Sequence, residues 1–364
     1  MNYRLATILA REAVSTDFTK VIDLNLADPV SQLQITYEST GTGGGIPDGH
    51  VAKCITKIEL VDGSDVLYSL SGQEAQAVDF YHRGIEPPNL NYYLAGTEGF
   101  WVFNVNFGRY LYDQVFAFDP KKFTNPQLKI TIDRNAGGIV SSAGFLTVLA
   151  HIFDGKAITP EGFLMQKEIN NYGMASASHE YIDLPTDYPV RKLFIAAQTY
   201  GVGPEWLLDT IKLSEDNDRK IPLSDTFANI LRSIVGQNRP FREVLLAASY
   251  STTNTFYCTP CFWPTLIATK WSNEANLYGL ALYEGDGGRG YQRCTTAAGN
   301  YAVQVEGWCP HGAIEIPFGL QDDPADWYDV TKLGSLRLDI LSKSGRSSAD
   351  TVQIFLQQLR KYAA

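Results

Sequence analysis

The sequence carries little charge and lacks the marks of an exported or membrane-embedded protein. Only 19% of its 364 residues are charged, against roughly 25% in an average soluble protein. No apolar run approaches the about 18 residues of a membrane-spanning helix, and there is no Asn-x-Ser/Thr sequon. The apolar run at residues 5–10 is too short for a secretory signal, and no small-residue cleavage site follows it. We therefore expect a protein that is neither exported nor inserted in a bilayer.

Basic segments are also missing. The net charge is −10, the pI is about 5.0, and no run of Lys and Arg occurs. Proteins that bind nucleic acid through its phosphates are normally basic, at least locally. We expect no direct contact with nucleic acid.

Motifs of catalysis are absent as well. Neither HExxH nor GxSxG occurs, and the five histidines are scattered. The Gly-rich stretches 41–49 and 284–290 lack the Lys-Ser/Thr of a phosphate-binding loop and are interpreted as loops. The sequence therefore predicts neither an enzyme nor a bound cofactor.

Aromatic residues, by contrast, are plentiful. They make up 12% of the chain, with 20 Tyr and 18 Phe. Interface cores are poor in charge and rich in aromatics, but β-strands favour aromatics too. The composition fits both a self-associating protein and an ordinary β-protein.

The most informative feature is an internal duplication. Residues 21–35 read VIDLNLADPVSQLQI and residues 181–195 read YIDLPTDYPVRKLFI, at a constant offset of 160. Seven positions are identical in the two segments: Ile22, Asp23, Leu24, Pro29, Val30, Leu33 and Ile35 match Ile182, Asp183, Leu184, Pro189, Val190, Leu193 and Ile195.

Three further landmarks follow in the same order in both halves. Residues 58–75, IELVDGSDVLYSLSGQEA, match residues 211–228, IKLSEDNDRKIPLSDTFA, at an offset of 153. NFG at 106–108 then resembles PFG at 317–319, and LKITI from Leu128 resembles LRLDI from Leu336. The chain is therefore expected to contain two copies of one domain.

Each copy is expected to hold strands around one helix. In the first copy, the alternating residues around the turn at 62–65 predict a β-hairpin. Ser71 and Glu74 form a capping box and Gly84 a C-cap, so a helix is expected between them. In the second copy, Ser224 and Gly236 are expected to begin and end the helix.

Many short strands with Gly, Pro and Asn turns indicate β-sandwiches. We predict an all-β protein of two tandem eight-stranded jelly rolls, each with a short helix, although the sequence does not separate a jelly roll from other sandwich topologies. The expected boundaries are an N-terminal arm or helix over 1–20, jelly roll 1 over 21–160 and jelly roll 2 over 161–364.

The second copy is longer than the first. Leu60 and Phe107 are 47 residues apart, whereas Leu213 and Phe318 are 105 apart, a difference of 58 (105 − 47). We expect the additional residues within 239–312, where a long insertion leaves one end of the sandwich.

Most of the cysteines lie in or beside this insertion. A zinc ion could be held by thiolates, and the candidate ligands are Cys258, Cys261, Cys294 and Cys309, with His311 as a substitute for one of them. The spacing after Cys261 matches no common zinc finger. We expect buried thiols, with zinc or a disulfide as the alternatives, and place Cys54 in a buried strand.

The segment Ile58–Gly84, IELVDGSDVLYSLSGQEAQAVDFYHRG, resembles the strand, hairpin and helix of double-jelly-roll major capsid proteins. These come from tailless icosahedral bacteriophages with an internal membrane. The resemblance implies a virion protein, assembled in the host cytoplasm, whose homotrimers form pseudo-hexagonal capsomers. It brings no catalytic residues, since the shared motif is structural.

The resemblance also implies partners. They are neighbouring capsomers, penton and minor capsid proteins, and the internal membrane or its proteins. The amphipathic stretch from Tyr3 to Val14 would lie beneath the capsomer against the membrane or a neighbour. The alternative is an ordinary helix packed on its own domain.

A different function remains open for the same fold. Lectin domains are also jelly rolls, and a fold does not determine function. In a carbohydrate-binding or glycan-cleaving protein, tryptophans of the insertion would stack on sugars and a glutamate would supply the carboxylate. The candidates are Trp263, Trp271, Trp308, Glu306 and Glu315.

Overall fold

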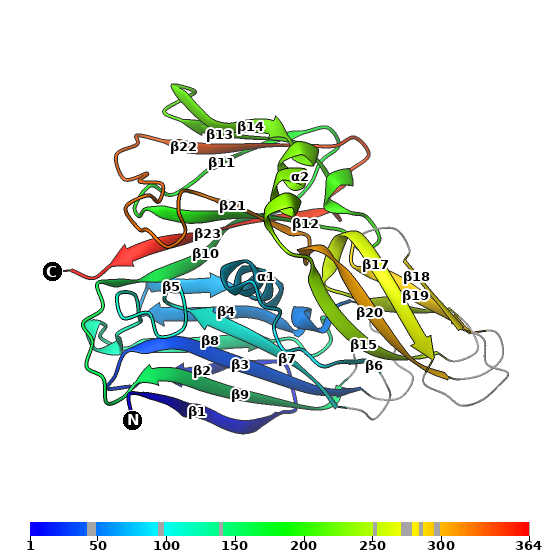
Figure 1. The fold of residues 1–364 in the computed structure, drawn as a ribbon, viewed down its shortest axis with the longest axis horizontal. Coiled ribbons are helices and arrows are strands. Elements are labelled where there is room, and N and C mark those ends of the chain that lie inside the picture. Colours follow the sequence, from blue (N-terminus) through cyan, green and yellow to red (C-terminus); the bar gives the residue numbers. More distant parts are fainter. Residues whose placement is uncertain are drawn as a thin grey trace.

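The computed structural model describes residues 1–41, 49–93, 98–137, 141–249, 253–270, 279–283, 287–294 and 299–363. Two β-sandwiches lie against each other, and a further group of strands lies at one end of the molecule (Figure 1). Both chain termini lie at the opposite end (Figure 1). In the described ranges, no helix has the length and apolar character to cross a bilayer.

The first sandwich is built from eight strands. They are β1 (Tyr3–Val14), β2 (Phe18–Asp23), β3 (Val30–Gly41), β4 (Ile55–Asp62), β5 (Asp65–Leu70), β7 (Glu98–Asn106), β8 (Pro126–Ile132) and β9 (Ser141–Phe153). One sheet has the order β1-β9-β3-β7, and the facing strands have the order β2-β8-β4-β5. Every second residue of β8 is buried, as expected where one face of a strand lies on the core.

The second sandwich repeats this arrangement. Its strands are β10 (Gly162–Gly173), β11 (His179–Asp183), β12 (Val190–Gln198), β13 (Leu208–Glu215), β14 (Lys220–Thr226), β21 (Ala313–Pro317), β22 (Leu336–Ser342) and β23 (Thr351–Lys361). They are ordered β10-β23-β12-β21 and β11-β22-β13-β14. In each sandwich, strands 1, 8, 3 and 6 of the eight form one sheet and strands 2, 7, 4 and 5 the other. This is the jelly-roll topology, so the predicted fold class is confirmed.

One strand pair joins the two sandwiches. β10 lies parallel to β5, with Gln166 opposite Tyr68 and Lys167 opposite Ser69. The pair produces one continuous sheet of eight strands, β2-β8-β4-β5-β10-β23-β12-β21. Hydrogen bonds of the backbone therefore run from the first domain into the second.

Six strands lie between the helix of the second copy and β21. They are β15 (Phe241–Ser249), β16 (Thr253–Tyr257), β17 (Pro260–Lys270), β18 (Gly279–Tyr283), β19 (Arg289–Cys294) and β20 (Gly299–Pro310). β6 (Asn91–Tyr93) of the first copy pairs with β15, which gives the sheet β17-β20-β15-β6, called the inserted sheet below. The sheet β16-β19-β18 lies beside it.

The first helix follows the sequence prediction. α1 (Gly72–Arg83) begins after Ser71, whose hydroxyl accepts the Glu74 N–H while the Glu74 carboxylate accepts the Ser71 N–H. It ends at Gly84, which has φ 64° in the left-handed region. The described residues also contain three short 3₁₀ segments: η1 (Val51–Cys54), η2 (Pro120–Lys122) and η3 (Pro204–Trp206).

The predicted ends of the second helix were wrong. α2 (Phe227–Gln237) is capped by Thr226 rather than Ser224, and Gly236 lies inside it, before the C-cap Asn238. The cause is the preceding turn: β4 and β5 are joined by two residues, whereas β13 and β14 are joined by four. The two additional residues place β14 and α2 two positions later in the sequence than the match with the first copy predicts.

The prediction of an N-terminal arm or helix over 1–20 was also wrong. Residues 3–14 form strand β1, which pairs with β9 from Tyr3 to Val14. Two register shifts, between Thr7 and Leu9 and between Leu9 and Glu12, interrupt the alternation of the strand. A register shift adds one residue to the strand, so the apolar side chains that share a face are no longer two positions apart. Their spacing along the sequence then resembles that of a helix.

The first glycine of α1 is expected to resist substitution. A Cβ on Gly72 would overlap the Ala52 carbonyl oxygen and lie 2.9 Å from Phe103 Cε1. We expect Gly72→Ala to lower the free energy of unfolding by about 1–3 kcal/mol, measured by urea unfolding. Gly236→Ala in α2 is the control, because no atom lies within 4 Å of its added Cβ. It should raise stability by about 0.5–1 kcal/mol, and equal effects of the two changes would contradict the packing of α1.

Candidate functional site: the domain junction and the inserted sheet

Helix α1 lies where the two sandwiches and the inserted sheet meet (Figure 1). Ten of its twelve residues are buried, among them polar residues that would normally face water. The aromatic ones pack on other parts of the chain. The ring centroids of Phe80 and Phe241 are 5.0 Å apart, and those of Tyr81 and Phe194 are 6.2 Å apart. The helix is thus the centre of the contact between domains.

Polar side chains of α1 are bonded to the second copy. The Tyr81 hydroxyl donates to the Ala313 carbonyl at 2.9 Å, and the Lys192 ammonium donates to the Tyr81 carbonyl at 2.8 Å. Gln76 Oε1 lies 3.1 Å from His311 Nε2. Because a buried polar group needs a partner, these bonds favour one relative position of the two domains.

Buried charges at the junction are paired. Lys192 and Glu315 form an ion pair at 2.5 Å, with side chains only 5% and 7% exposed. Burial lowers the pKa of Lys192, and the Glu315 carboxylate opposes that shift. The Asp79 carboxylate pairs with Arg83 of the same helix, and it also accepts from Asn104 at 2.9 Å and Asn106 at 2.7 Å. Removing one partner would leave an uncompensated charge, which is costly in a protein interior.

Glu243 of β15 attaches the inserted sheet to the first sandwich. Its buried carboxylate accepts the Thr259 N–H at 2.5 Å, the Thr259 hydroxyl at 2.9 Å and the Asn91 amide at 3.0 Å. Asn91 in turn accepts the Trp101 indole N–H at 2.6 Å. Burial raises the pKa of Glu243 to about 7, although the bonds from Thr259 and Asn91 oppose that shift.

His50 extends this network. Its Nδ1 accepts the Ala52 N–H at 3.1 Å, so in the neutral ring the proton lies on Nε2, which is 3.2 Å from the Thr259 hydroxyl. Burial lowers the pKa of His50 to about 3. The His311 ring lies edge-on at 4.7 Å. A neutral His50 is therefore part of the support for the insertion.

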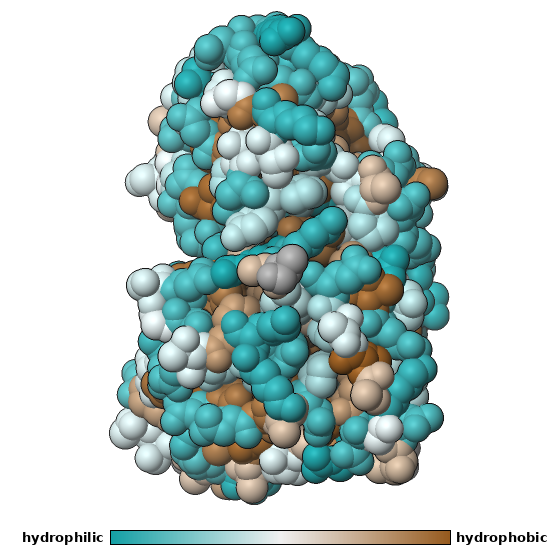
Figure 2. All heavy atoms as spheres, turned by 90° about the vertical axis from the view of Figure 1, so that its left-hand side faces the viewer, coloured by the Kyte–Doolittle hydropathy of each residue, from teal (hydrophilic) through white to brown (hydrophobic). Residues whose placement is uncertain are grey.

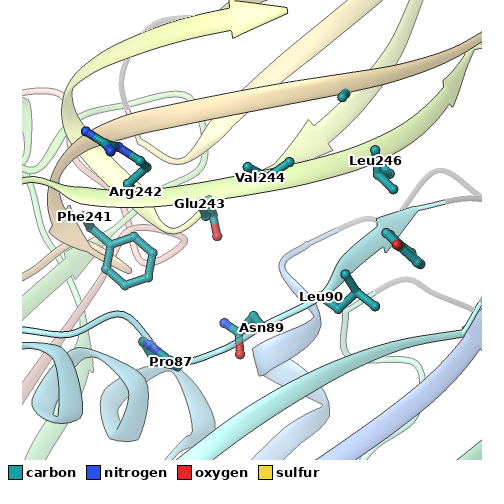
Figure 3. Close-up of a pocket in the computed structure, with 10 residues that line it drawn as sticks. Pro87, Asn89, Leu90, Phe241, Arg242, Glu243, Val244 and Leu246 are labelled. Atoms are coloured by element: carbon teal, nitrogen blue, oxygen red, sulfur yellow. The ribbon is translucent and has the colours of Figure 1, made fainter. Parts of the chain in front are cut away.

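A groove lies between the chain that follows α1 and strand β15 (Figure 3). It has a volume of about 530 Å³. Pro87, Asn89 and Leu90 lie across it from Phe241 and Glu243, whose side chains point toward them (Figure 3). At its rim, Arg242 pairs with Glu306 at 2.7 Å. The groove is mainly apolar, so it suits packing rather than acid–base chemistry.

The candidate metal ligands lie in the insertion, as expected, but not as one described cluster. Cys258 precedes β17, Cys261 lies in β17 and Cys309 in β20, all buried. The Cys261 thiol donates to the Thr259 carbonyl at 3.5 Å. Cys294 ends β19, and its side chain lies outside the described residues.

Among the side chains that the structure describes, no three of His, Cys, Asp or Glu gather as metal ligands would. The expectation of thiols, and its alternatives of zinc or a disulfide, stay predictions. Cys54 is buried, as expected, but it ends η1 rather than lying in a strand.

Three of the residues considered for sugar binding, Trp263, Trp308 and Glu306, lie on neighbouring strands of the inserted sheet, whereas Glu315 lies in β21. Trp263 is 54% exposed and lies edge-on to Trp308 at 6.3 Å. Glu306 and Glu315 are each engaged by a cation, Arg242 and Lys192 respectively. Trp271 lies outside the described residues, as do 42–48 and 284–286 of the two Gly-rich stretches.

The central position of α1 was hard to predict from the sequence. Its polar residues suggested a solvent-facing side, whereas Gln73, Gln76 and Asp79 are buried with polar partners. These partners lie far away along the chain. The only available signal was the number of polar residues between the two helix caps.

Comparisons with known proteins identify the fold. No family model matches the chain, and no curated protein matches it. Among solved structures, the capsid protein of Sulfolobus Turreted Icosahedral Virus has a TM-score of 0.62 at 11% identity, covering 100% of this chain and 98% of that one. The major capsid protein P2 from Bacteriophage PM2 has 0.54 at 12%, covering 99% and 98%. The PBCV-1 virus capsid has 0.59 at 10%, covering 98% and 94%.

These structures span the whole chain, so the resemblance to double-jelly-roll major capsid proteins is confirmed as a likeness of fold. The identities of 10–12% show the fold alone.

Replacing the buried Glu243 should change how stability depends on pH. In the unfolded chain a glutamate ionises near pH 4.3, whereas the pKa of Glu243 in the folded protein is about 7. Between these values the unfolded state alone loses its proton, so rising pH favours unfolding, by roughly 4 kcal/mol in total. Glu243→Gln should therefore gain stability relative to the native protein from pH 4 to pH 8, measured by urea unfolding.

Glu306→Gln, on the accessible side of the same sheet, is the matched control. A Glu243→Gln curve that stays parallel to the native one across this pH range would contradict the role of the buried carboxylate.

The state of the cysteines can be measured directly. We expect freshly purified protein to hold less than one zinc per chain by mass spectrometry of metals, and to titrate as five thiols when unfolded. Stoichiometric zinc that disappears in Cys258→Ser would instead establish the metal site, and fewer than five thiols would establish a disulfide.

Proposed function

We propose that this chain is a major capsid protein. Three copies form a pseudo-hexagonal capsomer, and capsomers tile an icosahedral shell around an internal membrane. The observation that carries the proposal is a double-jelly-roll fold shared over the full chain with viral capsid proteins. The role is structural rather than catalytic.

The duplication supports a ring of this kind. Two sandwiches with the same strand order make each chain present two similar units. Three chains related by a three-fold axis then present six similar sides from one gene product. Such a unit can occupy hexagonal positions of a shell.

The surface supports self-association. Large apolar side chains are exposed over much of the molecule. A single exposed apolar residue is common in any protein, so it is the number of such residues that indicates contacts. Among the described residues, the exposed large apolar side chains are Met1, Leu5, Val21, Ile85, Tyr110, Leu111, Val115, Tyr181, Trp206, Ile221, Val244, Trp263, Ile267 and Leu320. Figure 2 shows apolar patches among hydrophilic atoms on the end that carries both termini. Surfaces of this kind are typical of protein contacts.

The remaining partners follow from this placement. We propose penton and minor capsid proteins as neighbours in the shell, and contact between the internal membrane or its proteins and the end that carries both termini. The net charge of −10 favours no direct contact with the genome. Assembly would take place in the host cytoplasm, and the mature location is the virion.

The carbohydrate-binding or glycan-cleaving alternative rests on one observation, the exposed ring of Trp263. Cleavage is disfavoured because Glu306 and Glu315 are held in ion pairs. Sugar binding alone would need no acid.

Light scattering after size exclusion tests the proposal. We expect a mass of three 40.3 kDa chains, and shells or shell fragments of these trimers by electron microscopy. A chain that stays monomeric at high concentration would contradict the capsomer. Binding of that monomer in a glycan screen would then support the alternative.

A further inference from the structure

The two sandwiches correspond residue by residue along their strands. Val30 and Val190 occupy matched positions of the duplication, and the strand register shifts directly after each of them. The next pairs are Gln32 with His151 in the first copy and Lys192 with Gln357 in the second. His151 is therefore the counterpart of Gln357.

This correspondence relates β1 to β10. Leu5 of β1 pairs with His151, and Gln166 of β10 pairs with Gln357. Leu5 is thus the counterpart of Gln166, and Ala6 that of Lys167.

Within the chain, β10 covers an edge and a groove of the first sandwich. It lies along β5 with Gln166 opposite Tyr68. Gln166 Nε2 reaches over the sheet edge and donates to the Asn106 carbonyl at 3.1 Å. As a result, Gln166 is 1% exposed, and Phe194 and Phe355 on the same side of the second sandwich are 0% exposed.

The corresponding edge of the second sandwich is open. β14 is the counterpart of β5 and ends its sheet among the described strands. Six of its seven residues are exposed, whereas four of the six in β5 are buried. Leu223 pairs with Leu213 as Tyr68 pairs with Leu60, so Leu223 is the counterpart of Tyr68.

A groove beside β14 is open as well. This α2 groove has a volume of about 320 Å³ and lies between β14, α2 and β21; its apolar lining is Leu223, Ile230, Ile234, Ile316 and Pro317. Ile234 lies eight residues after the N-cap of α2, and Asp79 lies eight residues after the N-cap of α1, so the two are counterparts. Asp79 is 0% exposed, whereas Ile234 is 7% exposed.

The face that would fit this groove is exposed on the first sandwich. Leu5 of β1 is 53% exposed, although its counterpart Gln166 is buried. Gln34 and Leu149 are partly exposed, whereas their counterparts Phe194 and Phe355 are completely buried. The molecule therefore carries both halves of one further junction, on opposite sides of the chain.

We propose that a second copy of this chain occupies the α2 groove, with its β1 lying parallel to β14 as β10 lies parallel to β5. The inference rests on the proposed capsomer and names its interface. Leu5 of one copy lies opposite Leu223 of the next, and Ala6 opposite Ser224. Each copy uses β1 on one side and β14 on the other, so the contact is head-to-tail, and in the proposed capsomer three such contacts related by the three-fold axis close the ring.

Crosslinking tests the register. The double variant Leu5→Cys/Leu223→Cys is expected to give covalent dimers and trimers on a non-reducing gel after oxidation with copper phenanthroline or treatment with a short bismaleimide. Each single variant carries only one of the two added cysteines and should give no more crosslinked product than the native protein does.

A charge placed in the contact tests its contribution. Leu5→Asp should raise at least tenfold the concentration at which half of the trimers dissociate, measured by light scattering on dilution. Val21→Asp is the matched control, since Val21 is 47% exposed on β2 and its counterpart in the duplication, Tyr181, stays 61% exposed beside the junction within the chain. Both exposed sites should keep the native circular dichroism spectrum, which separates loss of assembly from loss of folding.

The results distinguish the interface from the capsomer. Native trimers that give no crosslink in the double variant and tolerate Leu5→Asp would overturn the proposed interface and leave the capsomer standing. A native protein that is monomeric would overturn both. Crosslinked trimers together with dissociation of Leu5→Asp would establish the contact.

Discussion

The parallel pairing of β5 with β10 is the contact on which the rest of the structure depends. A jelly roll has sheet edges whose backbone groups need partners, and a free edge is a site of association. Here the edge of the first sandwich is used inside the chain, since β10 continues the sheet into the second sandwich. That pairing brings the outer face of β12 and β23 over α1. It thereby determines which surfaces are buried and which remain for assembly.

Polar groups make this junction specific. An apolar contact alone tolerates sliding, whereas a buried ion pair or amide has few positions in which it is satisfied. Lys192 holds both Glu315 and the end of α1, and Asp79 is held by two asparagines. In the proposed ring, the contact between copies is more apolar, with Leu5 and Leu223 in place of Gln166 and Tyr68. That difference suits a contact formed after folding, because apolar surfaces associate without strict geometry.

The sequence predicted features that depend on neighbouring residues. The hairpin before α1 and both caps of α1 could be predicted because each depends on residues a few positions apart, and the duplication because it repeats the sequence itself. The N-terminal strand was missed because its register shifts imitate a helical pattern. The cap of α2 was misplaced because a longer turn moved it by two residues. The junction was not predictable, since Gln76 and Tyr81 acquire their partners from residues more than 200 positions away.

The insertion explains why the helix of the first sandwich is covered and the helix of the second is not. Its inner face packs on α1, and Glu243 and His50 attach it to the first sandwich through Thr259. β6, which comes from the first copy, completes its sheet. The insertion thus belongs to both sandwiches of one chain, and it covers α1 while α2 stays open. In the proposed ring, α1 is covered within its own chain and the α2 groove by the next copy, so the two kinds of contact between sandwiches differ and the symmetry is three-fold rather than six-fold.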